Sequence, residues 1–286
     1  MIDSIKAKTG AGIREICRIL KIPHSSYYHA ATETPTVTSD RELTPVITDI
    51  FKSHVRRYGY RRIYSDRVDL SITCAPARVR RLMAENGLRA LQPKSHTPKT
   101  RDGRADAPSP NLTAGKPLPA SPCRAWAGDI TYIPVDGGWV YLAVIIDLCT
   151  RQIVGWSLAD NMRAALVTVA LEQALGTKII EPGLIFHSDR GSQYGSELFR
   201  DRLADISARQ SMSGRANPYD NAWIESVIGT IKHEMIQDGC FEDIDDARVA
   251  RFDYIDGYYN TRRKHSSIGY TTPNQYERNL TNLTKK

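Results

Sequence analysis

The sequence predicts an α/β protein whose core holds a mixed five-stranded sheet, preceded by a small all-α region of helix-turn-helix-like character. Within residues 123–240, three successive strand patterns are followed by alternating helix and strand patterns. Residues 41–91 show helical periodicity, and the proline-rich segment 92–122 separates the two regions. We therefore expect a helical segment at 1–40, a helical domain at 41–91, a linker at 92–122, the core at 123–240 and a helical, basic tail at 241–286.

The composition is that of an ordinary globular protein. Of 286 residues, 41% are hydrophobic and 25% are charged, which excludes a disordered chain. No segment approaches the roughly 20 apolar residues of a membrane span, and residues 1–30 lack the apolar core of a signal peptide. A cytoplasmic protein is expected. The cysteines are scattered and never spaced as Cys-x-x-Cys, which predicts buried, reduced thiols at Cys17, Cys74, Cys123, Cys149 and Cys240.

The charge is unevenly distributed along the chain. Residues 1–118 contain 21 Lys and Arg against 11 Asp and Glu, whereas the remainder contains 18 against 21. A basic N-terminal part joined to a mildly acidic C-terminal part is typical of a protein that binds a polyanion with one part and acts on it with the other. The alternative is a soluble protein that is merely basic.

Helical patterns dominate the first hundred residues. Residues 11–21 and a short stretch from His24 give only a fragment of a helix-turn-helix. Thr44-Pro45 is typical of a helix start, a second helix follows Tyr58-Gly59, and residues 76–86 form a third, closed by Gly87. The basic side chains on these helices either contact DNA phosphates or form a solvated face; the candidates for DNA contact are Arg61, Arg62, Arg78 and Arg81.

The segment 92–122 contains seven prolines and almost no apolar residues. We interpret it as an extended linker that orders only when it meets a partner. After it, strands are expected at 130–135, 139–146 and 151–158, joined first by the turn Asp136-Gly137-Gly138. A helix at 163–175, a buried strand at 183–187, a helix at 196–207, a short strand at 208–212 and a long helix at 218–237 follow. This order is the ribonuclease-H-like arrangement.

Three acidic residues occupy informative positions in this arrangement. Asp129 lies in the first strand, and Asp189 follows the fourth strand directly, where ligands bind in sheets of this kind. Glu225 lies at the edge of the apolar stripe of the long helix. That helix is expected to be capped by Asn217, with Pro218 in its first turn and Asp220 at its third position. Lys232 projects from the same side two turns later.

Three carboxylates aimed at one point repel one another, and a divalent cation removes that cost. Mg²⁺ prefers hard oxygen ligands and keeps places for water and phosphate. Two such ions, about 3.5–4 Å apart, support in-line displacement at phosphorus. Activated water would nick DNA, and an activated 3′-hydroxyl would join strands.

Several motifs together resemble a known family. Between Asp129 and Asp189 lie 59 residues, and between Asp189 and Glu225 lie 35. The chain resembles insertion-sequence transposases of the DDE type, with a core similar to retroviral integrase, and more narrowly the OrfB products of the insertion-sequence-three family. The matching segments are 126–132, 140–147, 151–156, 187–194, 217–222, Glu225-Ser226, Lys232, Glu234 and 259–273.

The resemblance implies a catalytic site and its partners. Asp129, Asp189 and Glu225 would be the catalytic metal ligands for Mg²⁺ or Mn²⁺, two ions per site when DNA is bound, and Lys232 would lie near substrate DNA. Residues 42–90 would form the DNA-binding segment. The implied partners are double-stranded DNA, comprising the terminal inverted repeats and the target, further copies of the chain, and an upstream-frame protein or fusion that supplies the missing leucine zipper.

Further residues are candidates beside these. His187 is a candidate for orienting the loop of Asp189, and Asp147, at the end of an apolar strand, is expected to be structural. Asn221 stands one turn before Glu225 and could reach substrate. The basic cluster after Tyr258-Tyr259 is either a solvated run or a set of phosphate contacts. The candidates for DNA backbone contact are Arg190, Gln193, Tyr194, Arg262, Arg263 and Lys264.

The sequence thus predicts a transposase that cleaves and joins DNA at the ends of an insertion sequence, a DDE polynucleotidyl transferase. Two alternatives remain open at this stage. A plain nuclease could use the same core, and strand joining would distinguish it. A catalytically silent DNA-binding regulator would bind ends without metal-dependent cleavage.

Overall fold

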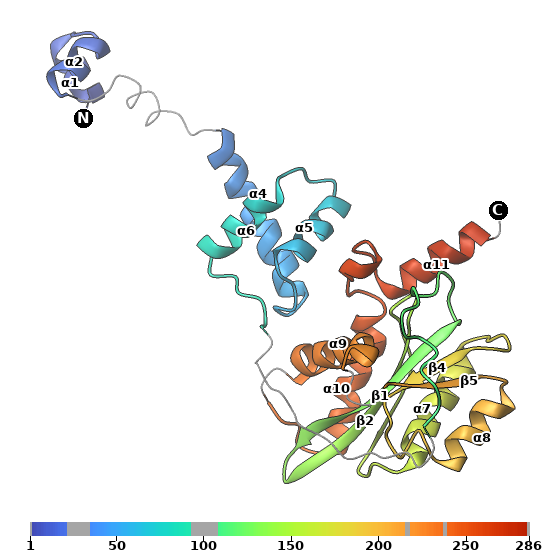
Figure 1. The fold of residues 1–286 in the computed structure, drawn as a ribbon. Helices are drawn as coiled ribbons and strands as arrows, with labels where there is room; N and C mark the ends of the chain where they lie inside the picture. Colours follow the sequence, from blue (N-terminus) through green and yellow to red (C-terminus); the bar gives the residue numbers. More distant parts are fainter. Residues whose placement is uncertain (1, 22–34, 93–107, 215–217, 237–238, 285–286) are drawn as a thin grey trace. The chain divides into compact units, whose positions relative to one another are not determined.

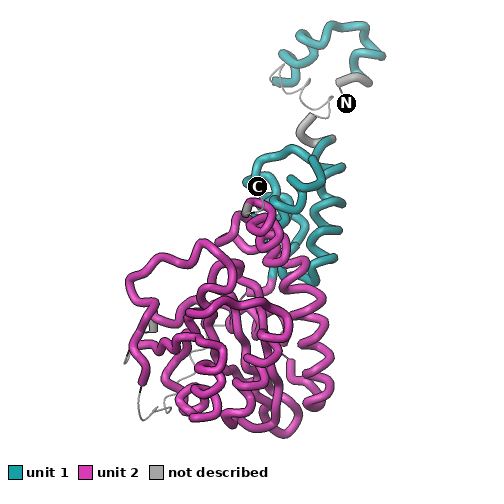
Figure 2. Tube along the Cα trace, turned by 90° about the vertical axis from the view of Figure 1, so that its right-hand side faces the viewer, with its two compact units in different colours: residues 1–90 teal, residues 91–286 magenta. Residues whose placement is uncertain are grey.

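The computed structural model describes residues 2–21, 35–92, 108–214, 218–236 and 239–284 (Figure 1). The chain forms two compact units, residues 1–90 and residues 91–286 (Figure 2). In the described residues, no helix is both long enough and apolar enough to cross a membrane. The expected short helix from His24 lies outside the described residues.

The first unit is helical, as predicted. Its helices are α1 (Ile2–Thr9), α2 (Ile13–Ile19), α4 (Pro35–Ser53), α5 (Tyr60–Asp69) and α6 (Pro76–Glu85). Gly87, which follows α6, has φ +66°, the left-handed conformation that ends helices and favours glycine.

The predicted helix start at Thr44-Pro45 is wrong, because α4 begins at Pro35 and carries Pro45 in its interior. The Thr44 hydroxyl donates a hydrogen bond to the Asp40 carbonyl within the helix, instead of capping it. An interior proline costs about 3 kcal/mol of helix stability. Burial of Ile47 and Phe51 on the packed face of the helix offsets this cost.

The second unit holds the predicted mixed five-stranded sheet, in the order β3-β2-β1-β4-β5. Neighbouring strands are antiparallel from β1 to β3, whereas β4 runs parallel to β1 and β5 runs parallel to β4. This is the ribonuclease-H-like arrangement that the sequence predicted. The strands are β1 (Ala125–Val135), β2 (Gly138–Asp147), β3 (Ile153–Ala159), β4 (Ile185–Ser188) and β5 (Arg209–Met212).

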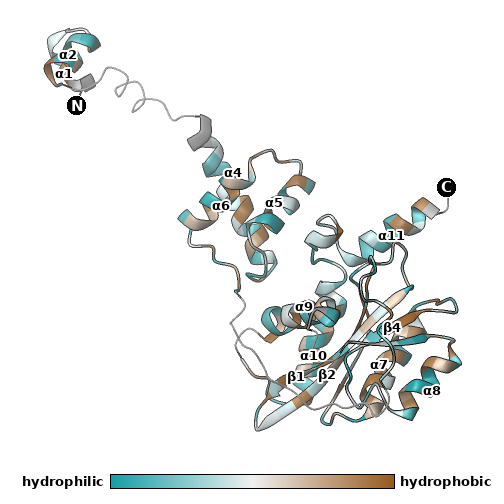
Figure 3. Ribbon diagram, viewed as in Figure 1, coloured by the Kyte–Doolittle hydropathy of each residue, from teal (hydrophilic) through white to brown (hydrophobic). Residues whose placement is uncertain are grey.

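Helix α7 (Ala164–Thr177) covers one face of the sheet, together with α8 (Glu197–Asp205). The apolar side chains of α7 pack against Trp126, Ile145 and Phe186 in the main core, and Figure 3 shows that α7 is largely hydrophobic. Gly155 of β3 permits this packing, because a Cβ built there would lie 2.2 Å from the Ala170 carbonyl oxygen of α7. The alternate side chains of β1 and β2 face α9 and α10, which contact the sheet from the other side.

The expected long helix at 218–237 is divided into three pieces. A 3₁₀ turn (Pro218–Asn221) leads into α9 (Ala222–Ile231), and a π-helical turn (Lys232–Ile236) follows it. Asn217 lies outside the described residues, so its expected cap is untested. The Asp220 carboxylate accepts a hydrogen bond from the Gly214 amide, which lies outside the helix. The C-terminal part contains α10 (Ile244–Tyr254), a π-helical turn (Ile255–Tyr259), a 3₁₀ turn (Ser266–Ile268) and α11 (Pro273–Thr284).

The described part of the expected linker, from residue 108 onward, is packed onto the core instead of extended in solvent. The Pro110 carbonyl accepts a hydrogen bond from the Met212 amide at the outer strand β5. The Leu112 amide donates to Ser211 Oγ at 2.8 Å. An outer strand exposes unpaired backbone groups, and this segment covers them. We call residues 108–119 the strap.

Two predictions about single residue types had different outcomes. Asp147 is structural, as expected: its buried carboxylate accepts the amides of Cys123, Cys149 and Thr150, with the Trp126 indole and the Thr150 hydroxyl as further donors. All five cysteines are free, as expected, but only Cys17 and Cys149 are buried. Cys240 is exposed, which corrects the expectation that all of these thiols are buried.

Candidate active site

Asp129 lies in the middle of β1, on the face of the sheet that α9 contacts. Its neighbours Gly128 and Ile130 point to the opposite face, where a Cβ on Gly128 would meet Phe186 at 2.7 Å. Asp129 Oδ1 accepts a hydrogen bond from the Ile130 amide at 2.8 Å. Burial raises the pKa of the Asp129 carboxyl to about 8, and the charges of Asp189 and Glu225 add to this rise.

Asp189 follows β4, which is parallel to β1 and adjacent to it. Its Oδ1 accepts the Gly191 amide at 2.9 Å. A Cβ on Gly191 would lie 2.9 Å from that oxygen and 3.0 Å from Gln193 Oε1, so a larger residue there would have to displace these two side chains. The side chain remains accessible to solvent, but the surrounding protein atoms desolvate it and raise its pKa.

Glu225 and Lys232 come from the helix that crosses this face of the sheet. Glu225 is exposed in the first turn of α9. Lys232 begins the π-helical turn and is half-buried, which lowers its pKa, while the charge of Asp129 acts in the opposite direction. Lys232 in turn lowers the pKa of Asp129. The two side chains therefore lie within electrostatic range of each other.

The three predicted carboxylates converge electrostatically but are not in a coordination arrangement. Asp129 senses the charges of both Asp189 and Glu225. Among the described residues, however, no three His, Cys, Asp or Glu side chains lie close enough together to hold a metal ion. Like charges repel, and both aspartates are turned onto local amides.

His187 lies in β4, two residues before Asp189, and is completely buried. Its Nδ1 lies 2.8 Å from Ser211 Oγ and 3.2 Å from Thr113 Oγ1, and its Nε2 lies 3.3 Å from Ser213 Oγ. Burial lowers the pKa of His187, while a hydrogen bond to the Asp220 backbone opposes that shift. The ring therefore joins β4, β5, the strap and the turn that leads to α9.

The candidates for DNA contact around the Asp189 loop differ in exposure. Arg190 donates to the Ser213 carbonyl at 2.8 Å, and Gln193 donates to the Met162 carbonyl at 3.0 Å; both remain partly exposed. Tyr194 is only 2% exposed and packs between Phe186 and Phe199. The expectation that Tyr194 touches DNA is corrected accordingly, since its ring belongs to the core.

Asn221 sits one turn before Glu225, as predicted, and is 5% exposed. Its side-chain carbonyl oxygen is buried and has no hydrogen-bond partner in the described part of the chain. Leaving such an acceptor unsatisfied costs about 1–3 kcal/mol. Burial separates this side chain from DNA, which corrects the expectation that Asn221 reaches substrate.

The four candidate arginines of the helical unit differ in their contacts. Arg78 and Arg81 both pair with Asp40 of α4, and Arg81 pairs with Glu85 as well. These ion pairs join α6 to α4. Arg61 is exposed, and its guanidinium lies 4.9 Å from the Tyr60 ring centroid; Arg62 lies 5.6 Å from the Tyr58 ring centroid.

The basic cluster of the tail is mostly buried. Arg263 is 4% exposed and forms a two-pronged ion pair with Glu234, so it is not available to phosphate, contrary to expectation. Lys264 is 7% exposed, whereas Arg262 is exposed. The sequence could not separate these three residues, because the burial of a loop depends on contacts that are distant along the chain.

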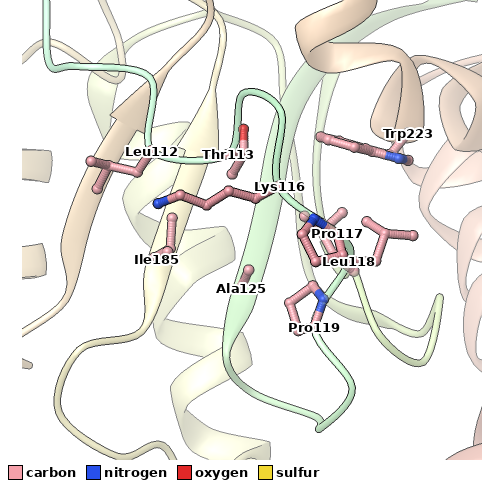
Figure 4. A pocket seen from close by; sticks show the side chains of 10 residues that line it. Leu112, Thr113, Lys116, Pro117, Leu118, Pro119, Ala125, Ile185 and Trp223 are labelled. Carbon is pink, nitrogen blue, oxygen red and sulfur yellow. The ribbon is translucent and has the colours of Figure 1, made fainter.

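Two features of the site were missed by the sequence analysis. The first is the ion pair between Glu234 and Arg263, although both residues fell within matched motifs. The second is the strap, which encloses a cavity of about 60 Å³ with Trp223 of α9. Figure 4 shows Leu112 and Leu118 of the strap in the wall of this cavity, with Ile185 of β4. The helix that carries Glu225 thus also borders the strap.

Comparison with known proteins gives consistent matches. The chain matches the integrase core domain over residues 119–218 and 207–273, and an HTH-like domain over residues 38–96. It is 39% identical to the transposase for insertion sequence element IS904 of Lactococcus lactis, over 82% of this chain and 93% of that protein. It is 33% identical to transposase InsF for insertion sequence IS3A of Escherichia coli, over 93% of each. The solved HTLV-2 integrase catalytic core domain in complex with magnesium covers 55% of this chain and 97% of that chain, with 18% identity and a TM-score of 0.42.

Proposed function

Because the chain belongs to the IS3 family of insertion-sequence transposases, we propose that Asp129, Asp189 and Glu225 hold the divalent metal ions that DNA strand cleavage and strand transfer require. The protein is a polynucleotidyl-transferase-type enzyme of DNA transposition and integration. The observation that supports the assignment is the placement of the three acids: Asp129 lies in β1, Asp189 directly follows the adjacent parallel strand β4, and Glu225 lies in α9, which contacts β1. The carboxylates of three acids thus come from three separate elements that meet at the sheet.

The donor set fits a hard cation. All three side chains offer carboxylate oxygens, which Mg²⁺ and Mn²⁺ prefer. When bound, two such ions supply positive charge that stabilises the attacking and leaving oxygens at phosphorus. To bind them, Asp129 would give up the proton that its surroundings favour, and each aspartate would offer the carboxylate oxygen that does not accept the amide of Ile130 or Gly191. The repulsion among the carboxylates is then relieved.

Neighbouring side chains are proposed to place the DNA. Arg190 and Gln193, in the loop after Asp189, are partly exposed and suited to backbone phosphate contact. Lys232 would contact a phosphate close to Asp129. His187 would hold the Asp189 loop and the turn before α9 in register.

The remaining partners are also proposals. The HTH-like unit would bind the terminal inverted repeats of the element, with Arg61 and Arg62 as candidate phosphate contacts. Arg262 is the exposed candidate in the tail. Two ends must be held together for transfer into target DNA, which favours a multimer of this chain. An upstream-frame protein or fusion would supply further end contacts.

The test compares Asp189→Asn and Glu225→Gln with Asp201→Asn, an exposed acid on α8. Labelled DNA carrying the element's ends is incubated with Mg²⁺, and cleavage, strand joining and end binding are measured separately. Asp189→Asn and Glu225→Gln should lose cleavage and joining while binding ends normally, and Asp201→Asn should resemble the wild type. Normal cleavage by either active-site variant would refute the assignment. Cleavage without joining would indicate a plain nuclease, and end binding alone would indicate a regulator.

A further inference from the structure

A buried ion pair lies immediately beyond Lys232 in the chain. Arg263 Nε donates to Glu234 Oε2 and Arg263 Nη2 donates to Glu234 Oε1, both at 2.8 Å. The two side chains are 5% and 7% exposed. Two parallel hydrogen bonds between a guanidinium and a carboxylate fix the relative orientation of the groups, not only their distance.

The groups around this pair complete a closed polar cluster. The Tyr254 hydroxyl of α10 donates to Glu234 Oε2 at 2.9 Å. Arg263 Nη1 lies 3.2 Å from His265 Nε2, and the His265 ring packs edge-on against Tyr259 at 4.8 Å. The cluster therefore joins three elements: the π-helical turn after α9, helix α10 and the tail loop.

Burying two charges in this way is costly. The loss of hydration can exceed the attraction between the partners, so such a pair is weak evidence of a role in stability. A well-attested use of buried ionic groups is to fix one arrangement among several.

The ion pair can fix the arrangement of the turn that carries Glu234. Residues 232–236 form a π-helical turn, which is rare and occurs frequently at functional sites. Lys232 is its first residue and Glu234 its third. Lys232 begins the turn that follows α9, the helix that contacts the strand β1 of Asp129, and the charges of Lys232 and Asp129 influence each other. Whatever holds Glu234 also holds the turn from which Lys232 leaves the helix.

We propose that Arg263 is a positioning residue, which fixes the π-helical turn through Glu234 and so keeps Lys232 beside Asp129. This inference rests on the proposed function, since it concerns the same site. Arg263 touches neither DNA nor metal in this role. The basic tail residue thus acts through the interior of the protein and not through phosphate contact.

The test removes both charges together, so that no unpaired charge stays buried. Glu234→Gln with Arg263→Met keeps an acceptor for the Tyr254 hydroxyl and similar side-chain volumes. This pair variant, Lys232→Ala and the combined triple variant are compared for single-turnover cleavage at saturating end DNA. Arg263→Lys, which retains the charge but loses the planar fork, is a milder second variant. Lys178→Met with Glu277→Gln removes another ion pair, between the end of α7 and α11, as a control.

The pair variant should cleave about 100-fold more slowly, the loss expected from a small misplacement of a positioned group. The triple variant should be no slower than Lys232→Ala alone, because the pair acts only through Lys232. Arg263→Lys should show a smaller loss that also disappears in the Lys232→Ala background. The control variant should cleave at the wild-type rate. Wild-type cleavage by the pair variant, or losses that multiply in the triple variant, would overturn the proposal.

A second readout does not depend on catalysis. Lys232 is half-buried in the wild type, so its acylation by an amine-reactive ester, measured by mass spectrometry, should be slow relative to exposed Lys116. In the pair variant and in Arg263→Lys, labelling of Lys232 should rise toward that of Lys116. Unchanged labelling in both would also reject the proposal. If the wild-type protein failed to cleave, the proposed function would fall, whereas this labelling experiment would still test the positioning role.

Discussion

The raised pKa of Asp129 has a consequence for stability that can be measured without DNA. Below about pH 3.8, the ordinary pKa of an aspartate, the carboxyl is protonated in both the folded and the unfolded chain, so its burial does not lower the folding stability. Between pH 3.8 and about 8 the unfolded chain releases the proton while the folded protein retains it. The resulting loss of folding stability therefore grows through this range and is constant above pH 8.

Asp129→Asn should remove this cost, since an amide has no charge to bury and its oxygen can still accept the Ile130 amide. Each tenfold difference in proton affinity corresponds to about 1.4 kcal/mol. At pH 7 the full difference is therefore about 4 kcal/mol. Solvent reaches the half-buried side chain and screens it, so we expect Asp129→Asn to be more stable than the wild type by about 2 kcal/mol at pH 7.

The assay is urea denaturation followed by tryptophan fluorescence at pH 4.5, 6, 7 and 8.5, with Asp136→Asn as a control. Asp136 is an exposed acid in the turn after the same strand. The advantage of Asp129→Asn should be small at pH 4.5 and largest at pH 8.5, and Asp136→Asn should show no such trend. Added Mg²⁺ should stabilise the wild type at pH 8.5 and so narrow the difference. A difference that does not change with pH would refute the reasoning.

Two further predictions concern positions on which the site depends. Gly155→Ala should destabilise the second unit by about 3 kcal/mol, because the new Cβ would lie 2.2 Å from the Ala170 carbonyl oxygen. Thermal denaturation compares this variant with Gly176→Ala, at an open helical position where a small gain in stability is expected. Equal effects of the two substitutions on stability would contradict the packing argument. Asp147→Asn should cost about 2–6 kcal/mol in urea denaturation, because its single carbonyl oxygen leaves two of the donors, the Cys123 amide and the Trp126 indole, without an acceptor. A loss below about 1 kcal/mol would mean that these hydrogen bonds contribute little.

The sequence alone predicted the order of strands and helices along the core, since alternating patterns and turn residues are local signals. It also proposed Asp129, Asp189 and Glu225 as catalytic residues through their spacing and flanking motifs. The structural role of Asp147 was evident from its place at the end of an apolar strand. The strand patterns and the role of Asp147 depend on residues that are close together in the chain, whereas the three acids were singled out by their intervals along it and by the motifs around them.

Where distant segments meet, the sequence was insufficient. The strap looked like a linker because its prolines and polar residues give no periodic signal, yet its backbone groups bind the outer strand β5. Thr44-Pro45 has the local chemistry of a helix start, but α4 continues through it because the burial of Ile47 and Phe51 stabilises the helix. Tertiary contacts outweighed local preference in both cases.

The amino-acid sequence by itself determined which side chains are candidates for metal and DNA chemistry, because residue type and spacing are enough to indicate an acid at a strand end. Only the tertiary structure decided what each charge does. Arg262, Arg263 and Lys264 are consecutive and basic, yet one is exposed and the other two are buried, with Arg263 held by Glu234. The energy of a charge depends on its hydration and on its nearest opposite charge, and both are set by residues far away in the chain.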